Sequence, residues 1–131
     1  MIETALYQYL AAYIPLTSLV GTRIEPVVAS QGTIRPNLVY FKIGDDRKFS
    51  LDGFSKLSAT RLQLSCFADL YETNGSVIGA KNVAIQVIAA MEAWTGASGI
   101  QAVYSIGERD LFETETEIHH IPLDFIVWHS L

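Results

Sequence analysis

The sequence has few of the residues on which disulfide-bonded, membrane-spanning and phosphate-binding proteins depend. It contains one cysteine, Cys66, so it cannot form a disulfide within the chain. No uncharged apolar run approaches the roughly 18 residues that span a bilayer. The 9 Lys and Arg residues are outnumbered by 14 Asp and Glu residues, and the resulting net charge of −5 argues against general binding of nucleic-acid phosphates. We therefore expect a soluble protein of the reducing cytoplasm, without a membrane partner.

The composition is that of one folded domain. Hydrophobic residues make up 50% of the chain and charged residues 18%. A chain of this size can bury about two thirds of its unfolded surface. The sequence contains no internal repeat, low-complexity tract or linker. We therefore expect residues 1–131 to form a single domain, with Cys66 as a buried core residue.

Helical periodicity predicts two main helices. The first is expected over residues 3–13 and is ended by Pro15, and a short helical turn follows over residues 16–21. The second is expected over residues 72–94, where apolar residues recur every three or four positions. Glu72 would begin this helix and Gly96 would follow its end.

Alternation of apolar and polar residues predicts the strands. Strands are expected at residues 38–44, 59–68, 100–107 and 118–128, and the short extended piece around Pro26 is either an edge strand or irregular. Leu62, Leu64 and Cys66 are expected to share one face of their strand. In the last strand, one face is expected to carry His119, Ile121, Leu123, Phe125 and Val127. Residues 29–37 are expected to form a loop, and residues 45–58 form either a mobile loop or the end of a long hairpin. The order of elements predicts an α+β fold, in which two main helices pack on one face of a mostly antiparallel sheet.

The segment ETEIHHIPLDFIVWH contains the residue types of a metal site or an acid–base pair. In a strand, however, His119 and His120 point to opposite faces and cannot chelate one metal ion together. His120 and Asp124 share a face but lie roughly 13 Å apart along the strand, beyond hydrogen-bonding reach. The face that also carries Ile126 and Trp128 is instead typical of a surface covered by another subunit.

Other catalytic and metal-binding templates do not fit. The sequence has no phosphate-binding loop, no G-x-S-x-G and no C-x-x-C. The acidic loop over residues 108–117 lacks the ligand order and the glycine of an EF-hand. Asp45 and Asp46 are interpreted as part of a charged loop tip rather than a carboxylate pair. We expect no catalytic residue, metal site or cofactor; an enzyme that uses His120 or the acidic loop is the weakest hypothesis.

Three segments in the same order and spacing resemble the tail-completion proteins of long-tailed phages, the minor tail proteins that include tail terminators and tail-to-head joining proteins. Residues 16–44, LTSLVGTRIEPVVASQGTIRPNLVYFKIG, contain a helical turn ending in Val-Gly, then Arg-Ile, and a strand begun by proline. Residues 49–68, FSLDGFSKLSATRLQLSCFA, contain aromatic-Ser-Leu-Asp-Gly and a strand that ends in Cys and an aromatic residue. Residues 108–129, ERDLFETETEIHHIPLDFIVWH, end in Asp-Phe-x-Val-Trp-His.

The resemblance implies a structural virion protein, of a kind also present in gene transfer agents. Such a subunit forms a ring, typically a hexamer, at the head-proximal end of the tail tube. The ring stops polymerisation of the tube protein and joins the tail to a head-completion or connector protein. DNA passes through the ring without specific binding, and the protein is assembled in the host cytoplasm and becomes part of the virion tail.

Two charged groups are candidates for contact with a neighbouring subunit or the tube: the basic residues of segment 45–58 and the acidic residues of segment 108–117. A ring needs two unlike and complementary patches of this kind. A solvated surface is the other reading of both groups. The main alternative function is a small-molecule-binding or regulatory α+β domain, for which Tyr40, Tyr104 and Trp128 could line a pocket. The candidate interface residues are Arg47, Lys48, Lys56, Glu108, Arg109, Asp110, Glu113, Glu115, Glu117, His120 and Trp128.

Overall fold

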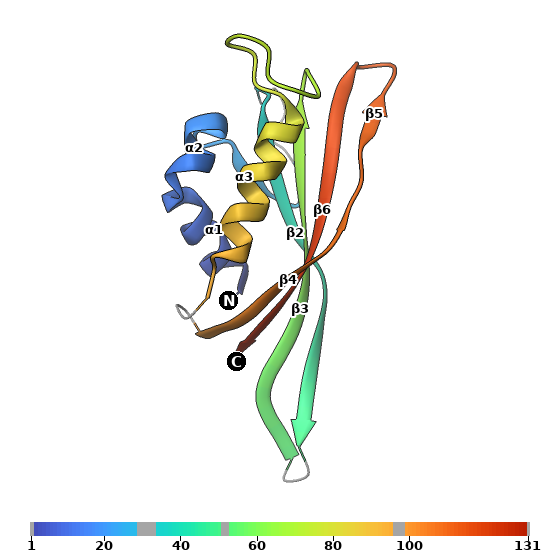
Figure 1. The fold of residues 1–131 in the computed structure, drawn as a ribbon. Helices are drawn as coiled ribbons and strands as arrows, with labels where there is room; N and C mark the ends of the chain where they lie inside the picture. The colour runs from blue at the N-terminus through green and yellow to red at the C-terminus, as the bar shows by residue number, and fades with distance from the viewer. Residues whose placement is uncertain (1, 29–33, 51–52, 96–98, 131) are drawn as a thin grey trace.

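The computed structural model describes residues 2–28, 34–50, 53–95 and 99–130, without the side chains of residues 47–56. Three helices pack on one face of a sheet (Figure 1): α1 (Ile2–Ala12), α2 (Ile14–Val20) and α3 (Ala80–Glu92). The strands are β1 (Ile24–Pro26), β2 (Asn37–Ser50), β3 (Gly53–Ala68), β4 (Ile100–Glu108), β5 (Leu111–Glu113) and β6 (Ile118–Ser130). The predicted α+β class, with helices on one face of a mostly antiparallel sheet, is confirmed.

The last strand in the sequence, β6, is an interior strand of the sheet, between β3 and β4. The strand order is β1-β2-β3-β6-β4, and β5 also pairs with β6. The β1–β2 pair is parallel, whereas the other pairs are antiparallel. Pro122 lies where the partner of β6 changes from β5 to β4, with the Arg109 backbone N–H donating to its carbonyl. A proline is tolerated at this change of partner because its missing N–H removes no ladder bond there.

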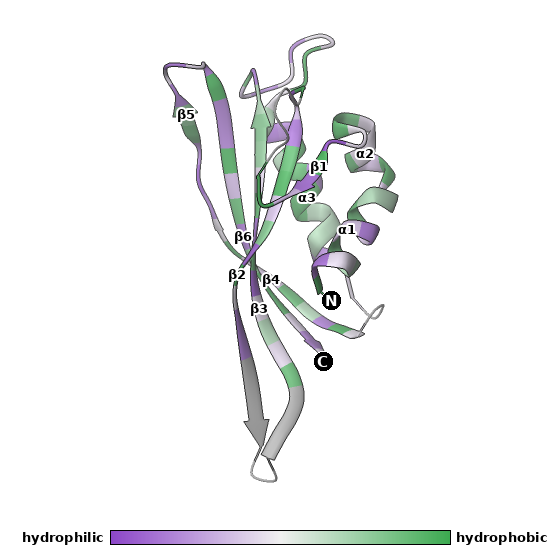
Figure 2. Cartoon of the chain, turned by 180° about the vertical axis from the view of Figure 1, so that it is seen from behind, coloured by the Kyte–Doolittle hydropathy of each residue, from purple (hydrophilic) through white to green (hydrophobic). Residues whose placement is uncertain are grey.

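The core lies between the helices and one face of the sheet. On β6, whose hydropathy is shown in Figure 2, four side chains predicted to share one face are fully buried: Ile121, Leu123, Phe125 and Val127. From β3, the predicted face of Leu62, Leu64 and Cys66 is fully buried beside them. Burial raises the pKa of the Cys66 thiol, so this cysteine is an unreactive core residue, as predicted.

Helix α1 is attached to the end of α3 by one tyrosine. The Tyr9 hydroxyl donates a 2.6 Å hydrogen bond to the Ala90 carbonyl, and the Tyr9 ring stacks on Trp94 with centroids 5.4 Å apart. Burial raises the pKa of Tyr9, which keeps the hydroxyl protonated as a donor. The apolar stripe predicted for the second helix is buried at Ala80, Ala84, Val87, Met91 and Trp94, whereas Val77 and Ile85, which the same pattern includes, are exposed.

The predicted start of the second main helix is wrong. Helix α3 begins at Ala80 with Gly79 as its N-cap, and residues 72–78 form turns instead. Asn74 and Val77 exchange backbone hydrogen bonds around Gly75, whose φ of 62° suits glycine. In this folded-back conformation a side chain at Gly79 would place its Cβ 2.4 Å from the backbone of Glu72, so the close approach of the turn to the start of α3 requires glycine.

The two regions expected as loops contain strands. Of the alternatives for residues 45–58, the long hairpin is the one observed: we call residues 44–50 and 53–61 the arm, which projects past the helices (Figure 1). The expected acidic loop over residues 108–117 includes the short strand β5. Residues 29–33 of the expected loop, and Gly96, lie outside the described residues. No helix within the described ranges has the length and apolar character needed to cross a membrane.

Candidate assembly surfaces

One edge of the sheet is formed by β4 and β5. Both strands pair with β6 on one side, and on their other side no described strand is present. The side chains along this edge are unusually apolar for an exposed strand: Tyr104 is 57% exposed and Phe112 50% exposed, and Ile106 and Leu111 are also exposed. Two register shifts interrupt the β4–β6 pairing. Exposed backbone groups beside apolar side chains are the features of a strand edge that can join another chain.

The opposite edge is formed by β1 and β2. Pairing with β1 covers only Leu38–Tyr40 of β2, and the Val27 backbone N–H adds a 2.9 Å bond to the Tyr40 carbonyl. From Phe41 onward the outer edge of β2 has no described partner strand. Val27, Val28 and Ile34 lie exposed beside it, with Ile43 on β2 itself. The two edges of the sheet are therefore both open, both apolar and unlike each other.

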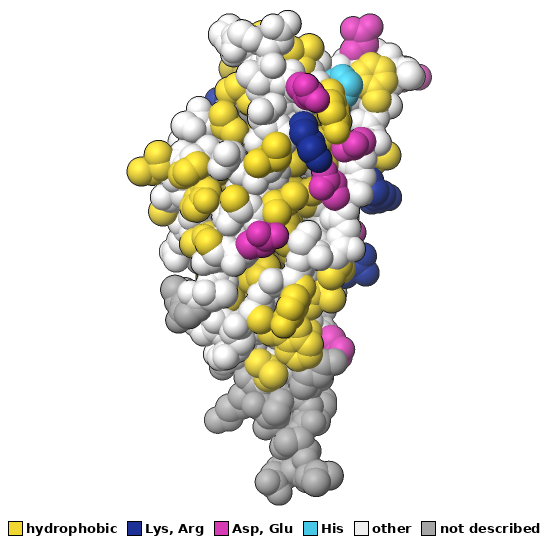
Figure 3. All heavy atoms as spheres, in the orientation of Figure 1, with side chains coloured by type: hydrophobic (Ala, Val, Ile, Leu, Met, Phe, Trp, Pro, Cys, Tyr) yellow, Lys and Arg dark blue, Asp and Glu magenta, His cyan; other side chains and the backbone are white. Residues whose placement is uncertain are grey.

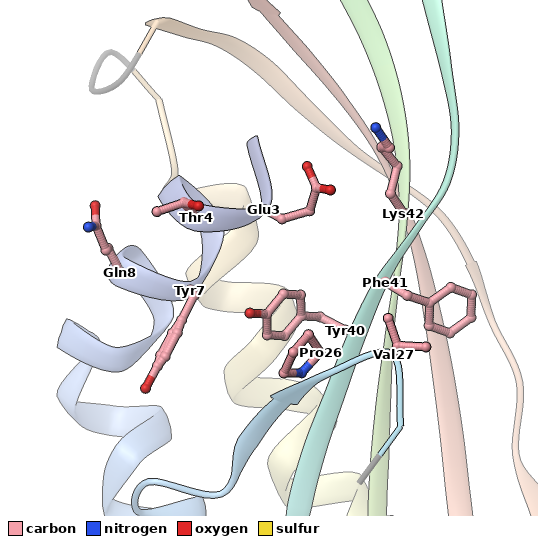
Figure 4. Close-up of a pocket in the computed structure, with 9 residues that line it drawn as sticks. All are labelled: Glu3, Thr4, Tyr7, Gln8, Pro26, Val27, Tyr40, Phe41 and Lys42. Atoms are coloured by element: carbon pink, nitrogen blue, oxygen red, sulfur yellow. The ribbon is translucent and has the colours of Figure 1, made fainter. Parts of the chain in front are cut away.

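A groove of about 560 Å³ lies beside this second edge, between α1 and β2 (Figure 4). Tyr7 from α1 meets Tyr40 from β2 edge to face, with ring centroids 6.4 Å apart, and the pKa of Tyr40 is raised first by burial. Lys42 and Glu3 lie at one end of the groove, and Phe41 points to the other side of the sheet. We refer to this feature as the groove; it is lined by Glu3, Thr4, Tyr7, Gln8, Pro26, Val27, Tyr40, Phe41 and Lys42.

The acidic segment divides into an internally bonded part and an exposed part. Glu108 forms a 2.5 Å ion pair with Lys81 of α3, which raises the pKa of that lysine. Asp110 accepts a 3.2 Å hydrogen bond from the Tyr71 hydroxyl. Figure 3 shows basic and acidic side chains in contact on this flank, with apolar side chains beside them. These two acids hold the segment against the body of the protein and are less available to a neighbouring subunit.

The remaining acids lie on the wing, the name we give to residues 109–120, which comprise β5, a turn and the start of β6. Glu113 accepts a 2.9 Å hydrogen bond from Thr116, which closes the turn. Glu115 and Glu117 are exposed in the turn, and Glu117 has a positive φ of 56°. The wing thus presents three acids and the apolar side chains of β5 at one end of the molecule.

The sheet face without helices carries His120. Its ring stacks on Phe67 with centroids 4.2 Å apart, whereas His119 contacts Phe112 and Tyr71 on the helix side. The prediction that the two histidines lie on opposite faces is confirmed. On the same helix-free face, Arg61 bonds Asp124 Oδ2 at 3.3 Å. His120 Nε2 and Asp124 Oδ1 are buried without a hydrogen-bond partner among the described residues.

The stability of the protein should depend on the protonation of His120. Burial is the largest cause that lowers its pKa, with Glu113 opposing and Arg109 adding to the effect. The unfolded chain therefore binds the proton more tightly, and the contribution of neutral His120 is fully present above about pH 6.5 and is lost as the pH falls. The variant His120→Phe keeps an aromatic ring on Phe67 but cannot bind a proton. We therefore expect its unfolding free energy to rise relative to that of the parent as the pH falls from 7 to 5.

Urea denaturation at pH 7, 6 and 5 measures this difference. The parent should lose more unfolding free energy than the variant over that range. A constant difference between the two proteins across the three pH values would mean that His120 titrates equally in the folded and unfolded chains.

A polar cluster at the base of the arm was missed by the sequence analysis. Asp45 Oδ1 accepts hydrogen bonds from Ser58 and, at 3.0 Å, from Thr60. The Thr60 hydroxyl also lies 2.7 Å from His129 Nε2, and His129 is buried. The Ser58 hydroxyl is the largest cause that lowers the pKa of Asp45. The interpretation of Asp45 as part of a loop tip is therefore wrong: it bonds the two strands of the arm together.

The candidate interface residues do not form one site. The backbones of Arg47 and Lys48 lie in β2 and that of Lys56 in β3, all in the arm, and their side chains lie outside the description. The wing extends toward the opposite end of the molecule (Figure 1). Trp128, on β6, is half-buried between Ala59 and Ala102 of the flanking strands. The backbone segments that carry the predicted basic and acidic residues thus lie toward opposite ends of the molecule.

The candidate residues were also considered for a metal site and for a pocket. Within the described ranges, no group of three or more His, Cys, Asp or Glu side chains is placed to hold a metal ion. Of the three aromatic residues considered for a pocket, Tyr40 lines the groove, whereas Tyr104 lies on the β4 edge and Trp128 on the helix-free face. The apolar residues of β4 are visible in its sequence. Which edge of the sheet stays open, however, depends on the strand order, and the pattern of a single strand does not reveal that order.

Comparison with known proteins agrees with the resemblance found in the sequence. The fold is similar to that of a chain in the solved structure "Virion of native gene transfer agent (GTA) particle", with a TM-score of 0.72 and 18% identity over 99% of this chain and 95% of that chain. No curated protein gives a significant match. The sequence matches the family model "Tail completion protein gp17" over residues 4–130. Because that match spans nearly the whole chain, this protein belongs to the gp17 family of tail completion proteins, which are structural components of phage-like virions.

Proposed function

We propose that the chain assembles with copies of itself into a ring, a hexamer, at the head-proximal end of the tail tube. The ring stops polymerisation of the tube protein and joins the tail to a head-completion or connector protein. Family membership supports a structural role without catalysis. In this proposal DNA passes through the ring, and the net charge of −5 disfavours adhesion of its phosphates.

The observation that carries the proposal is the pair of open sheet edges. A ring is built from heterologous contacts, in which one surface of each subunit meets a different surface of the next. The β4–β5 edge and the β1–β2 edge lie on opposite sides of one sheet and both expose apolar side chains. Joining them leaves no edge unpaired once the ring closes, which removes the risk of open-ended association.

Charge adds direction to this contact. The wing presents Glu113, Glu115 and Glu117, whereas β2 contains Lys42 and, in the arm, Arg47 and Lys48. We propose that the wing of one subunit meets the β2 side of its neighbour, since unlike charges favour that arrangement over contact between two wings. Lys56, His120 and Trp128 remain proposed contacts with a neighbouring subunit or the tube.

Tail length in particles made without this protein tests the proposed function. Electron microscopy should show overlong or uneven tails, because nothing would stop addition of tube subunits. Tails of normal length that fail to join heads would replace the terminator role with a joining role. Normal particles with heads attached would contradict both roles.

The groove favours a second candidate function, binding of a small molecule. It has the size of a ligand site and combines aromatic walls with Lys42 and Glu3 at one end. Native mass spectrometry of the purified protein would show a bound ligand in stoichiometric amount. A ligand-free spectrum would argue against this candidate.

A further inference from the structure

We propose that the groove between α1 and β2 receives the β5 segment, Leu111–Glu113, of an adjacent copy, with the Phe112 side chain inside the groove. The inference rests on the proposed ring and names the parts of the two subunits that meet in it. Three observations on β5 and β2 support it: the face of the sheet to which their side chains point, the open edge of each strand, and the exposure of their apolar side chains.

The sidedness follows from the pairing register. Phe112 lies opposite His119 in the β5–β6 ladder, and His119 contacts Tyr71 on the helix side of the sheet. Phe112 therefore also points to the helix side. Tyr7 and Tyr40, which line the groove, lie between α1 and β2 on the helix side, whereas Val27 lies beside Phe41 at the outer edge of β2 (Figure 4). If β5 of one copy continues the sheet of the next, Phe112 enters the side of the sheet on which the groove lies.

Among the described residues, each of the edges that would join lacks a partner strand over part of its length. β5 is paired with β6 on one side, and β1 covers the outer edge of β2 as far as Tyr40, which leaves it open from Phe41 onward. Addition of an extended segment to such an edge supplies main-chain hydrogen bonds, while a pocket beside the strand selects the side chain. In this protein the edge is β2 and the pocket beside it is the groove.

The side chains are complementary in character. Phe112 is 50% exposed on its own subunit, and Val27, which lines the groove, is 69% exposed. Tyr7 and Tyr40 supply aromatic walls that suit an aromatic ring, since such rings pack favourably edge to face or offset. The wing carries three glutamates, and the end of the groove holds Lys42 beside Glu3, so the lysine offers these glutamates one partner of opposite charge.

Cysteine cross-linking tests the contact. The variant Val27→Cys/Phe112→Cys is assembled on tail tubes and then oxidised, and a disulfide forms only where the two Cβ atoms approach within about 4.5 Å. The native Cys66 is fully buried and does not compete. Non-reducing electrophoresis should show a ladder that ends at the size of the closed ring. The matched control, Ile85→Cys/Phe112→Cys, uses a similarly exposed position on α3 and should show no ladder.

Each outcome decides between the proposals. Rings that are visible by electron microscopy but yield no ladder overturn this contact and leave the ring intact. Failure of the unaltered protein to form rings on tubes overturns both the contact and the proposed function. If the reduced double variant does not assemble, Phe112→Lys and Ile85→Lys replace it: loss of rings in Phe112→Lys alone supports the contact, and equal assembly by both variants overturns it.

Discussion

Truncation of Phe125 to alanine should cost about 3–5 kcal/mol of unfolding free energy, as large aromatic deletions in closed cores do. Phe125 is fully buried in β6, and its cross-strand neighbours are Leu62 of β3 and Ser105 of β4. Removal of the ring leaves a cavity in the core beside β6, and the strands on both sides of β6 limit relaxation of the backbone around it. Because a domain of this size is stabilised by about 5–15 kcal/mol, the loss is a large part of the total.

Urea denaturation followed by far-ultraviolet circular dichroism measures the effect. Ile85→Ala is the matched control, because Ile85 lies half-exposed on α3 and its truncation should change stability by about 0.5 kcal/mol or less. Similar losses for the two variants would show that β6 is not the centre of the core.

Placing lysine at Tyr104 and Ile106 should abolish ring formation while leaving the subunit folded. Both side chains are exposed on the β4 edge, so their replacement removes little buried area from the folded chain. If this edge joined another subunit, the two lysine side chains would lose their water without gaining a partner of opposite charge, which is energetically costly. Natural edge strands carry lysines that prevent association in this way. Tails assembled with this variant should therefore be overlong or uneven, as in particles without the protein.

The control for this experiment is Val77→Lys/Ile85→Lys, which adds the same charge at similarly exposed positions away from the sheet edges. Electron microscopy of tube ends and native mass spectrometry report ring formation, and circular dichroism reports folding. If the Tyr104/Ile106 variant forms rings at tube ends as often as the parent does, the β4 edge is not part of the interface. Loss of rings in both variants would point to charge in general rather than to the edge.

Much of the fold was predictable because local patterns agree with the tertiary structure. The alternation of Leu62, Leu64 and Cys66 identified the buried face of β3, and that of β6 followed from the same rule. The start of the second helix was not predicted, since periodicity outweighed the turn signal of Asn74–Gly75. The requirement for glycine at position 79 arises from contact with Glu72, which no local pattern reveals.

The candidate site was predictable only in part, for a related reason. Charge runs in the sequence identified the wing and the arm, but not that Glu108 and Asp110 are bonded within the subunit to Lys81 and Tyr71. Open edges depend on the strand order, in which distant segments become neighbours. The cluster of Asp45, Thr60 and His129 likewise joins residues as far as 84 positions apart, a relation that spacing along the chain does not encode.

The central position of β6 also affects when the subunit can take shape during synthesis. β3, β4 and β5 each pair with this strand, yet it follows all of them in the sequence. Until the ribosome has released residues 118–130, the nascent chain holds the β2–β3 hairpin but not the completed sheet. Such long-range pairing slows folding and extends exposure of apolar segments to chaperones. Of the two sheet edges that we propose as contacts between subunits, the one formed by β4 and β5 therefore takes shape last, because both strands pair with β6.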